Sequence, residues 1–301
     1  MKPSMIVQGE LTHAKYLLQQ LLVADLPVDC VIMAEHTTDT PEYQALITAS
    51  ALCPQFSLRM GTAADYAQAT WLVLTDLEEP LPALADRIVA LRRLTNRILE
   101  NGFRGQLVFT GQDDEVLTYF AWKYSGAAVG QIWGLGTYPV NQLLTYRLAD
   151  RLGVGVNAIQ TTVVGRAAEP VVAWSRTYVG PTPILMYLAN ADAAFNAEDL
   201  DKMESWLRRE ATGSQTALRY LTLIHLFQAL LANQPVIAPV AHPQPGETAL
   251  AVATPVLVTL QGTQAITNLA LSEDEQRAYS AETTAIHETI TQLEGTPTEG
   301  R

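Results

Sequence analysis

The sequence is poor in the residues that most directly reveal a chemical site. It holds two cysteines, Cys30 and Cys53, in 301 residues, and neither belongs to a Cys-x-x-Cys pair or to a cysteine–histidine cluster. This excludes a disulfide framework and a metal site of the usual ligand spacing, and it predicts a reducing, cytoplasmic compartment. Cys30 lies in the apolar run VDCVIMA and is expected to be a small buried hydrophobe.

Long apolar runs and positive charge are also scarce. The two longest segments without charged residues, 220–246 and 248–272, are interrupted by prolines and glycines, whereas a membrane span needs ~20 mostly apolar residues. The apolar run at residues 5–7 is too short for a secretion signal. Nineteen Lys and Arg against 31 Asp and Glu give a formal net charge of −12. Such a chain repels phosphates and anionic lipids, so neither nucleic acid nor a membrane is expected as a partner.

The chain does have enough apolar residues for a large core. Its hydrophobic content of 48 % and charged content of 17 % argue against disorder, and its length suits two lobes or domains. In the first half, apolar runs alternate with amphipathic segments. Strands are expected at 4–7, 29–34, 56–60, 70–74, 106–110 and 131–133, and helices at 13–23, 41–52, 83–101 and 115–124. This alternation predicts an α/β fold with a doubly wound parallel sheet.

The second half has a different pattern, which predicts an α+β arrangement. Helices are expected at 140–152, 197–209, 215–231 and 272–293, and strands at 161–164, 171–174, 236–240 and 249–260. The last two strands are β-branched and are expected to be antiparallel. Ser272, followed by three acidic residues, is a typical start for the terminal helix. The tail at 295–301 is expected to fray.

Four segments resemble the lactate/malate dehydrogenase family in order and spacing. They are NGFRGQLVFTGQDDEVLTYFAWKYSG (101–126), GLGTYPV (134–140), RLGVGVNAIQTTVVG (151–165) and PVLVTLQGTQAITNLALSEDEQ (255–276). The resemblance implies a Rossmann-type dinucleotide-binding domain at 1–139 and an α+β substrate domain at 140–301. It also implies NAD as the cofactor, an NAD-dependent L-lactate or malate dehydrogenase activity, and assembly into dimers or tetramers.

At the cofactor end, the positions that match the family's motif hold other residues. The glycine-rich turn reads QGELTH, so its three glycines fall on Gln8, Glu10 and His13, and Gly9 stands between them. Glu10 would place a negative charge against the cofactor phosphates, and two such charges ~4 Å apart repel by up to ~4 kcal/mol. The acid that would bind the adenosine ribose falls on Glu35, although a lone acid is weak evidence and a solvated glutamate at a strand end is the favoured explanation.

At the substrate end, the matching positions also lack the family's chemistry. The aspartate and arginine of the helix after GLGT fall on Val140 and Leu143, and the histidine falls on Ala167. Reduction of a 2-keto acid needs a proton donor poised near neutral pH and a guanidinium for the carboxylate, and none of these three residues supplies either. The loop at 75–82 holds no basic residue, and the asparagine position after the fifth strand holds Gln112.

The sequence therefore predicts a degenerate, catalytically inactive member of this family, a pseudoenzyme with a binding, regulatory or structural role. It is expected to form homo-oligomers or hetero-oligomers with an active paralogue. No cofactor is expected, with NAD retained only as an implication of the resemblance; Gly9 and Glu35 are then its candidate contacts. No metal is expected, because no histidine or cysteine spacing predicts one.

Two alternatives remain open at this stage. An NAD(P)-dependent oxidoreductase of the 2-hydroxy/2-keto acid type, with a rebuilt active site, would use His13, His36 and Arg166. Surface positions at a helix start and a strand end explain the two histidines as well. A sensor would instead bind a non-nucleotide small molecule in the old cleft, without turnover.

Overall fold

The computed structural model describes residues 2–188, 195–213, 215–266 and 269–295. Its first half is the predicted alternation of strands and helices. The strands are β1 (Ser4–Gly9), β2 (Asp29–Ala34), β3 (Ser57–Met60), β4 (Trp71–Leu74), β5 (Gln106–Phe109) and β6 (Ile132–Gly134). The helices are α1 (Leu11–Ala24), α2 (Thr40–Ser50), α3 (Leu84–Glu100) and α4 (Asp114–Ser125).

These six strands form one parallel sheet in the order β3-β2-β1-β4-β5-β6. The chain leaves β1 towards one edge and later returns to β4 at its other side, so the strand order reverses between β1 and β4. Ligands of doubly wound sheets bind at the carboxyl ends of the strands beside such a reversal. The predicted α/β fold class is confirmed.

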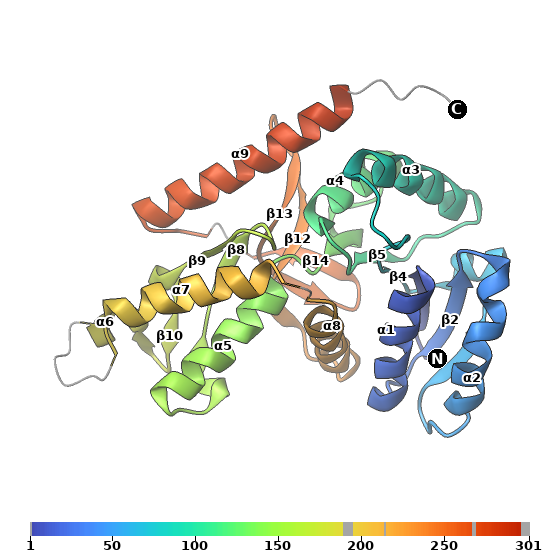
Figure 1. Cartoon of the computed structure of the whole chain (residues 1–301), viewed down its shortest axis with the longest axis horizontal. Coiled ribbons are helices and arrows are strands. Elements are labelled where there is room, and N and C mark those ends of the chain that lie inside the picture. Colours follow the sequence, from blue (N-terminus) through green and yellow to red (C-terminus); the bar gives the residue numbers. More distant parts are fainter. Residues whose placement is uncertain (1, 189–194, 214, 267–268, 296–301) are drawn as a thin grey trace.

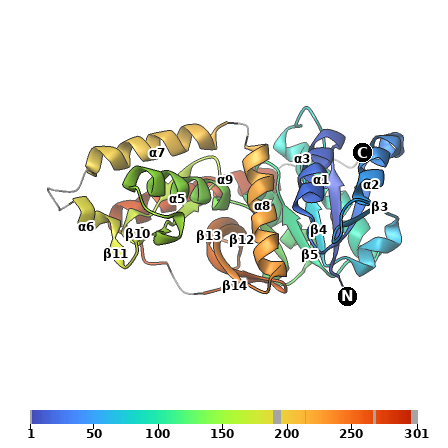
Figure 2. The same cartoon turned by 90° about the horizontal axis from the view of Figure 1, so that it is seen from below.

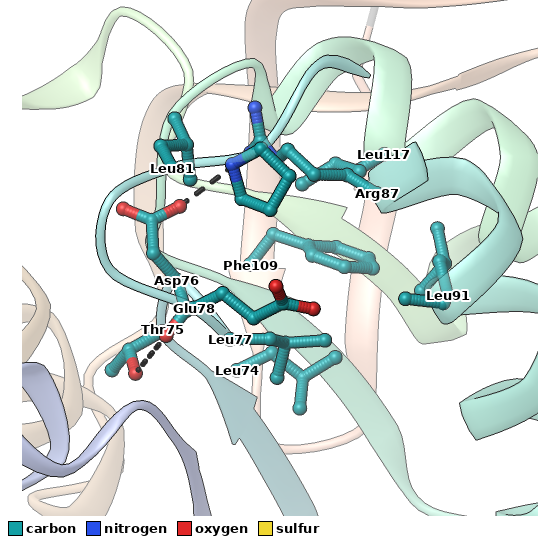
Figure 3. A pocket seen from close by; sticks show the side chains of 12 residues that line it. Leu74, Thr75, Asp76, Leu77, Glu78, Leu81, Arg87, Leu91, Phe109 and Leu117 are labelled. Carbon is teal, nitrogen blue, oxygen red and sulfur yellow. Dashed lines mark hydrogen bonds and ion pairs between the residues drawn. The ribbon is translucent and has the colours of Figure 1, made fainter. Parts of the chain in front are cut away.

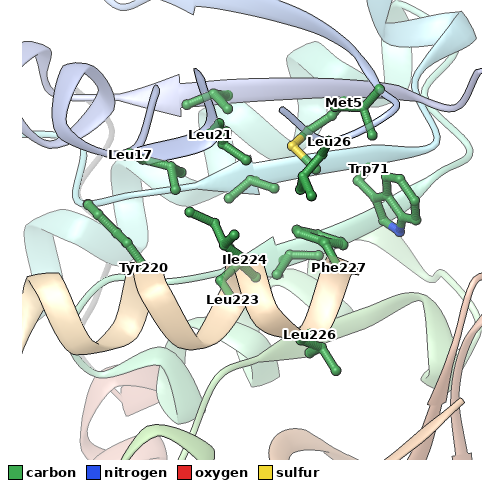
Figure 4. Packing of buried hydrophobic residues seen from close by; sticks show 14 of the residues in the cluster. Met5, Leu17, Leu21, Leu26, Trp71, Tyr220, Leu223, Ile224, Leu226 and Phe227 are labelled. Atoms are coloured by element: carbon green, nitrogen blue, oxygen red, sulfur yellow. The ribbon is translucent and has the colours of Figure 1, made fainter. Parts of the chain in front are cut away.

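The sheet is buried on both faces because alternate side chains of each strand point to opposite sides. In β1, Met5 and Val7 join a core with α1 and α2, whereas Ile6 joins a second core with α3 and α4. Cys30 lies in the first core and is 1 % exposed, as the sequence predicts. Figure 4 shows the first of these cores, and Figure 1 shows α1 and α3 on opposite sides of the sheet.

The second half extends the same sheet with antiparallel strands. Beyond β6 the order is β12-β13-β8-β9, with β14 also paired to β13, and β11-β10-β7 form a small separate sheet. The helices are α5 (Tyr138–Leu152), α6 (Ile184–Leu188), α7 (Ala197–Ala211), α8 (Thr216–Leu231) and α9 (Glu273–Gly295). The strands are β7 (Ile159–Gln160), β8 (Val163–Gly165), β9 (Pro170–Val172), β10 (Tyr178–Val179), β11 (Thr182–Pro183), β12 (Val236–Gln244), β13 (Leu250–Thr259) and β14 (Gly262–Ala265).

Some details of this half were not predicted. The sequence pattern missed α6, β7, β10, β11 and β14, which have two to five residues each. It also placed Trp174 in a strand, but β9 ends at Val172, and Trp174 begins a single helical turn. The sheet continues across the boundary proposed at residue 139, so the division into 1–139 and 140–301 stays a prediction. The tail beyond Gly295 lies outside the described residues.

Helix α8 joins the two halves. It stands between the lobes in Figure 2 and contacts both α1 and α5. Tyr220 packs against Tyr16 of α1 with ring centroids 5.8 Å apart, and Phe227 packs against Trp71 of β4 at 4.9 Å. Figure 4 shows this apolar face of α8 against the sheet. The packing fixes the start of α8, including Arg219, near the carboxyl ends of the parallel strands.

Among the described residues, no helix combines the length and apolarity needed to cross a membrane. The same residues hold no group of three or more His, Cys, Asp or Glu placed to bind a metal ion.

Candidate functional site at the carboxyl ends of the strands

The turn after β1 is closed by its own glutamate. Glu10 is the N-cap of α1, and its carboxylate accepts hydrogen bonds from the backbone N–H groups of Thr12 at 2.7 Å and His13 at 3.1 Å. Burial raises the pKa of Glu10, but the two backbone hydrogen bonds outweigh it and leave the pKa below its usual value. A carboxylate therefore occupies the amides at which a helix N-terminus would otherwise bind an external anion.

Gly9 is explained by packing between strands. A Cβ placed there would lie 1.7 Å from Oγ1 of Thr75 and 3.0 Å from the carbonyl oxygen of Asp76. The end of β1 is also tied to the next strand, because the Glu10 N–H donates to the Asp76 carbonyl at 2.8 Å. A glycine is thus required at this position whether or not a ligand binds.

A groove of about 780 Å³ lies beside this turn. Glu35 and His36, from the end of β2, line it together with Glu10. Glu35 is held by Gln8, whose side-chain amide donates to Oε1 of Glu35 at 2.6 Å. Gln8 itself is 1 % exposed and accepts a hydrogen bond from the Tyr66 hydroxyl at 2.8 Å. Gln8, which stands at a predicted glycine position, thus orients the strand-end acid.

His13 faces the loop after β4 and helix α8. Its Nε2 lies 3.4 Å from a carboxylate oxygen of Glu79, and its Nδ1 lies 3.4 Å from the Tyr220 hydroxyl. Since Glu79 also lines the groove, His13 stands beside the groove that His36 lines. The structure therefore places the two candidate histidines at the same edge of the sheet.

The loop at 75–82 is fixed to its neighbours by a buried polar cluster. Asp76 accepts a hydrogen bond from the Gln112 N–H at 3.1 Å and pairs with Arg87 at 3.5 Å. Burial raises the pKa of Asp76, with Arg87 acting in the opposite direction. Leu77 and Leu81 of this loop line a small cavity of about 30 Å³ over β4 and β5 (Figure 3). The loop is thus packed against α3, and the turn that contains Gln112 helps to hold it there through Asp76.

In the other half of this edge, a buried ion pair joins three elements. Asp114, at the start of α4, is fully buried and pairs with Arg219 of α8. Its Oδ2 also accepts the backbone N–H of Gly136 at 2.8 Å, and Nε of Arg219 donates to the Thr110 carbonyl at 2.8 Å. Asp114 and Arg219 therefore bind each other and the backbone near the ends of β5 and β6.

The loop that holds Ala167, where the resemblance places a histidine, is bound to α4. Glu115 is 4 % exposed, and its Oε1 accepts the backbone N–H of Ala167 at 2.6 Å. Burial first, and the charge of Asp114 second, raise the pKa of Glu115 to about 8. An uncharged carboxyl is thereby favoured in the folded protein at neutral pH, beside the position that the resemblance assigns to a catalytic histidine.

The remaining predicted positions lie apart from the groove. Val140 is 1 % exposed in a third core built on α5, and Leu143 is half-buried on the same helix. Arg166 pairs with Glu282 of α9, with Nε 2.6 Å from the carboxylate. The structure therefore brings His13, His36 and Glu35 to one edge of the first lobe, while Arg166 is engaged with the terminal helix.

Sequence reasoning missed three residues of this edge: Asp114, Glu115 and Arg219. A signal was present, since Arg219 is the one charged residue in the otherwise apolar helix TALRYLTLIHLFQALL. A lone arginine in such a helix needs a buried partner.

The comparisons with known proteins agree with this architecture. No protein-family model matches the chain. L-lactate dehydrogenase 2 of Enterococcus faecalis is 27 % identical over 221 residues, or 68 % of this chain and 67 % of that protein. L-lactate dehydrogenase 2 of Bacillus cereus is 26 % identical over 248 residues, or 76 % of this chain and 78 % of that protein.

Solved structures match nearly the whole chain. A lactate dehydrogenase from a Medee basin deep-sea metagenome library superposes with a TM-score of 0.83 at 19 % identity, covering 97 % of this chain and 99 % of that one. The ligand-bound minor L-lactate dehydrogenase of Enterococcus mundtii gives 0.82 at 20 % identity, covering 99 % of both chains.

The fold and the edge of the sheet define an α/β protein with a Rossmann-type sheet continued by a mixed second half, as in these lactate dehydrogenase structures. Within that class the chain is a lactate/malate dehydrogenase-like protein, a distant relative of the L-lactate dehydrogenases.

Proposed function

We propose that this protein does not catalyse the hydride transfer of its relatives and serves instead as a binding, regulatory or structural partner. The observation that carries the proposal is the Glu10 carboxylate on the amides of Thr12 and His13. Those amides are what a pyrophosphate needs, and a phosphate would meet a negative charge there. The residues of this turn do not fit NAD, so no step of a reaction is assigned to it.

The substrate end supports the same proposal. The positions that resemblance assigns to the acid, the arginine and the histidine hold Val140, Leu143 and Ala167. Val140 belongs to a core, and the Ala167 amide is bound by Glu115. Neither a bidentate carboxylate contact nor a histidine proton donor is available from these side chains.

The test is cofactor binding and turnover measured together. NADH and NADPH are titrated into the purified protein by calorimetry. Reduction of a panel of 2-keto acids is followed by the absorbance of the reduced cofactor. Native protein is expected to show no binding up to millimolar cofactor and no turnover. Glu10→Gly is expected to gain measurable cofactor binding, whereas a matched exposed-acid variant, Asp201→Asn, is not. Turnover that is lost on mutation of a groove residue would overturn the proposal.

A second candidate, an NAD(P)-dependent oxidoreductase with a rebuilt site, is favoured by one observation. Glu35 and His36 line the same groove, and His13 stands beside it. This reading expects micromolar binding of NADH or NADPH and reduction of a 2-keto acid that falls at least tenfold in His36→Ala or His13→Ala, as loss of a general acid requires. Absence of both signals would remove it.

The oligomeric role remains part of the proposal. The resemblance implies a homo-oligomer, or a hetero-oligomer with an active paralogue. Sedimentation of the protein alone and after mixing with such a paralogue distinguishes the two. A monomer in both experiments would contradict a structural role in an assembly.

A further inference from the structure

A second groove lies between the antiparallel strands of the second half and the start of α9. Its volume is about 540 Å³, and its walls come from β12, β13, β14, the loop after β14 and the first turns of α9. Figure 1 shows α9 running past β13. The two grooves share no described lining residue, so this one is separate from the groove beside the β1–α1 turn.

The lining of this second groove is free of formal charge. Nine of its fifteen described residues are apolar, three of them prolines, and the other six carry a hydroxyl, an amide or an imidazole. The groove beside the β1–α1 turn, by contrast, is lined by five acids and two arginines. An ion that entered the second groove would lose hydration without gaining an opposite charge. Its volume, apolar majority and few polar groups are those of a site for a small uncharged molecule.

A buried histidine fixes the hydrogen bonding on the strand side of the groove. His242 is 9 % exposed, and its Nε2 lies 2.7 Å from Oγ1 of Thr254. Burial lowers the pKa of His242, against a hydrogen bond to the backbone of Pro243. A proline has no backbone N–H, so the ring donates to the Pro243 carbonyl, and Nε2 of the neutral ring accepts from the Thr254 hydroxyl. The Thr254 oxygen then keeps lone pairs that can accept an N–H group of a ligand.

The helix side of the groove supplies a hydroxyl of the opposite use. Tyr279 of α9 lines the groove, and burial raises the pKa of its phenol, against a hydrogen bond with the side chain of Gln244. The phenol therefore keeps its proton and can donate it to a carbonyl oxygen. One wall thus presents an acceptor and the other a donor, and both groups are uncharged.

We propose that this groove binds a small uncharged molecule in which an amide group is attached to an apolar ring. The amide N–H would donate to the Thr254 oxygen, and the amide carbonyl would accept from the Tyr279 hydroxyl. The ring would pack on the prolines and cover Ile266, a lining residue whose side chain is 43 % exposed. Such a ligand would link α9 to the β12–β13 hairpin. The inference goes beyond the proposed function, because it uses no residue of the groove beside the β1–α1 turn.

The surroundings disfavour the other ligand classes. An anion would approach the acidic first turn of α9, which holds Glu273, Asp274 and Glu275. A cation would find no carboxylate among the described lining residues. A hydrocarbon would fill the space but leave the hydroxyls of Thr254 and Tyr279 without water or a partner, which costs free energy.

The test compares three ligands of the same size on the full chain. Phenylacetamide is the uncharged amide, and phenylacetate and phenethylamine are its anionic and cationic analogues. Saturation-transfer NMR is expected to show saturable binding of phenylacetamide in the millimolar range, as is usual for so small a molecule. Both ionised analogues are expected to bind about tenfold more weakly, because the groove offers them no opposite charge. No saturable binding of phenylacetamide, or equal binding of either ionised analogue, would overturn the proposal.

Two variants on β14 locate the binding. Ala265 is exposed and lines the groove, whereas its neighbour Gln264 is exposed and does not. Ala265→Phe fills the groove and is expected to weaken phenylacetamide binding about tenfold, or about 1.4 kcal/mol. The matched control Gln264→Phe is expected to bind as the native protein does, and thermal unfolding without ligand checks that both variants fold. Equal affinities of the two variants would overturn this location.

A third variant tests the hydrogen bond from the helix. Tyr279→Phe keeps the ring and removes the hydroxyl, and it is expected to weaken phenylacetamide binding several-fold. Unchanged affinity would overturn the role given to the Tyr279 hydroxyl.

Discussion

The two halves of the carboxyl edge keep the same strands but use charge in opposite ways. Beside β1 and β2, Glu10 takes the amides of α1, and a groove of about 780 Å³ stays open next to it. Beside β5 and β6, Asp114 and Arg219 pair with each other in the interior and bind the surrounding backbone. One half has an open groove, and its helix N-terminus is occupied by Glu10. In the other half, the charged side chains bind each other and the backbone.

The difference shows which half depends on local contacts and which depends on contacts between distant parts of the chain. The Glu10 contact is local and involves residues three positions apart at most, so its loss affects one helix end. Asp114 and Arg219 are 105 residues apart in the chain, and their ion pair joins α4 to α8. Both side chains are buried, so water cannot replace either partner. The half beside β5 and β6 is therefore part of the framework, whereas the half beside β1 and β2 keeps an open groove next to a turn that is closed only by local contacts.

The largest expected effect comes from breaking the buried pair. Arg219→Met leaves the Asp114 carboxylate buried without its cation, and breaking such a pair costs about 3–5 kcal/mol. Urea unfolding at pH 7 measures the loss. Arg277→Met is the matched control, because Arg277 and its partner Asp274 are 77 % and 86 % exposed, and it is expected to change the free energy of unfolding little. Equal effects of the two variants would contradict the framework role.

Glu115 is expected to make the stability of the half beside β5 and β6 sensitive to pH. Its pKa is raised to about 8 in the folded protein, first by burial and then by the charge of Asp114, from an ordinary value of 4.5. Between these values the folded state binds more protons than the unfolded state, so the stabilisation present below pH 4.5 is lost as pH rises through about 8. Urea unfolding at pH 5.5, 7 and 8.5 should therefore show stability falling as the pH rises.

Glu115→Gln supplies the control for that pH dependence. The glutamine keeps an oxygen for the Ala167 N–H but does not titrate. The variant is expected to flatten the slope of stability between pH 5.5 and 8.5, without loss of the fold. If the slope were unchanged, the pH dependence would belong to other groups.

Gly9 tests whether the first half keeps its glycine for packing. Gly9→Ala puts a Cβ 1.7 Å from Oγ1 of Thr75, so the strand end must shift, and overpacking of this kind costs about 1–3 kcal/mol. Adding Thr75→Ala to this variant removes the clashing oxygen and is expected to recover part of the loss. Thermal unfolding without any cofactor measures both. An alanine at position 9 that is as stable as glycine would show that packing does not require it.

Much of the fold could be predicted because its signals are local. The runs DCVIMA and TWLVL are apolar enough to be buried strands, and β2 has the predicted bounds. The short elements failed for the opposite reason. β14 is as long as β4, but its sequence, GTQA, contains no apolar run, and the two residues of β10 are too few for one. Both strands pair with a neighbour that supplies their hydrogen bonds.

The site was harder to predict because its contacts are long-range. The charge of Glu10 beside a helix start was readable from the turn, and its hydrogen bonds fit that reading. No spacing rule links Asp114 with Arg219, or Glu115 with Ala167, since the sheet and α8 bring them together from distant positions. Arg166 looked available for a ligand, but α9 supplies Glu282 as its partner.

The smallest expected effect is at Glu10, and it probes the open half most directly. Glu10→Ala removes an N-cap acceptor and should cost about 1 kcal/mol of stability. Glu10 has a lowered pKa, because the backbone hydrogen bonds outweigh burial, so its stabilisation is full above the unfolded value near 4.5 and is lost as pH falls through the lower folded value. The same variant frees the amides of Thr12 and His13 for an external anion. Sulfate should then raise the thermal midpoint of Glu10→Ala more than that of the native protein. An equal response would mean that those amides do not form an anion site even when the carboxylate is gone, and that the proposed absence of cofactor binding needs another explanation.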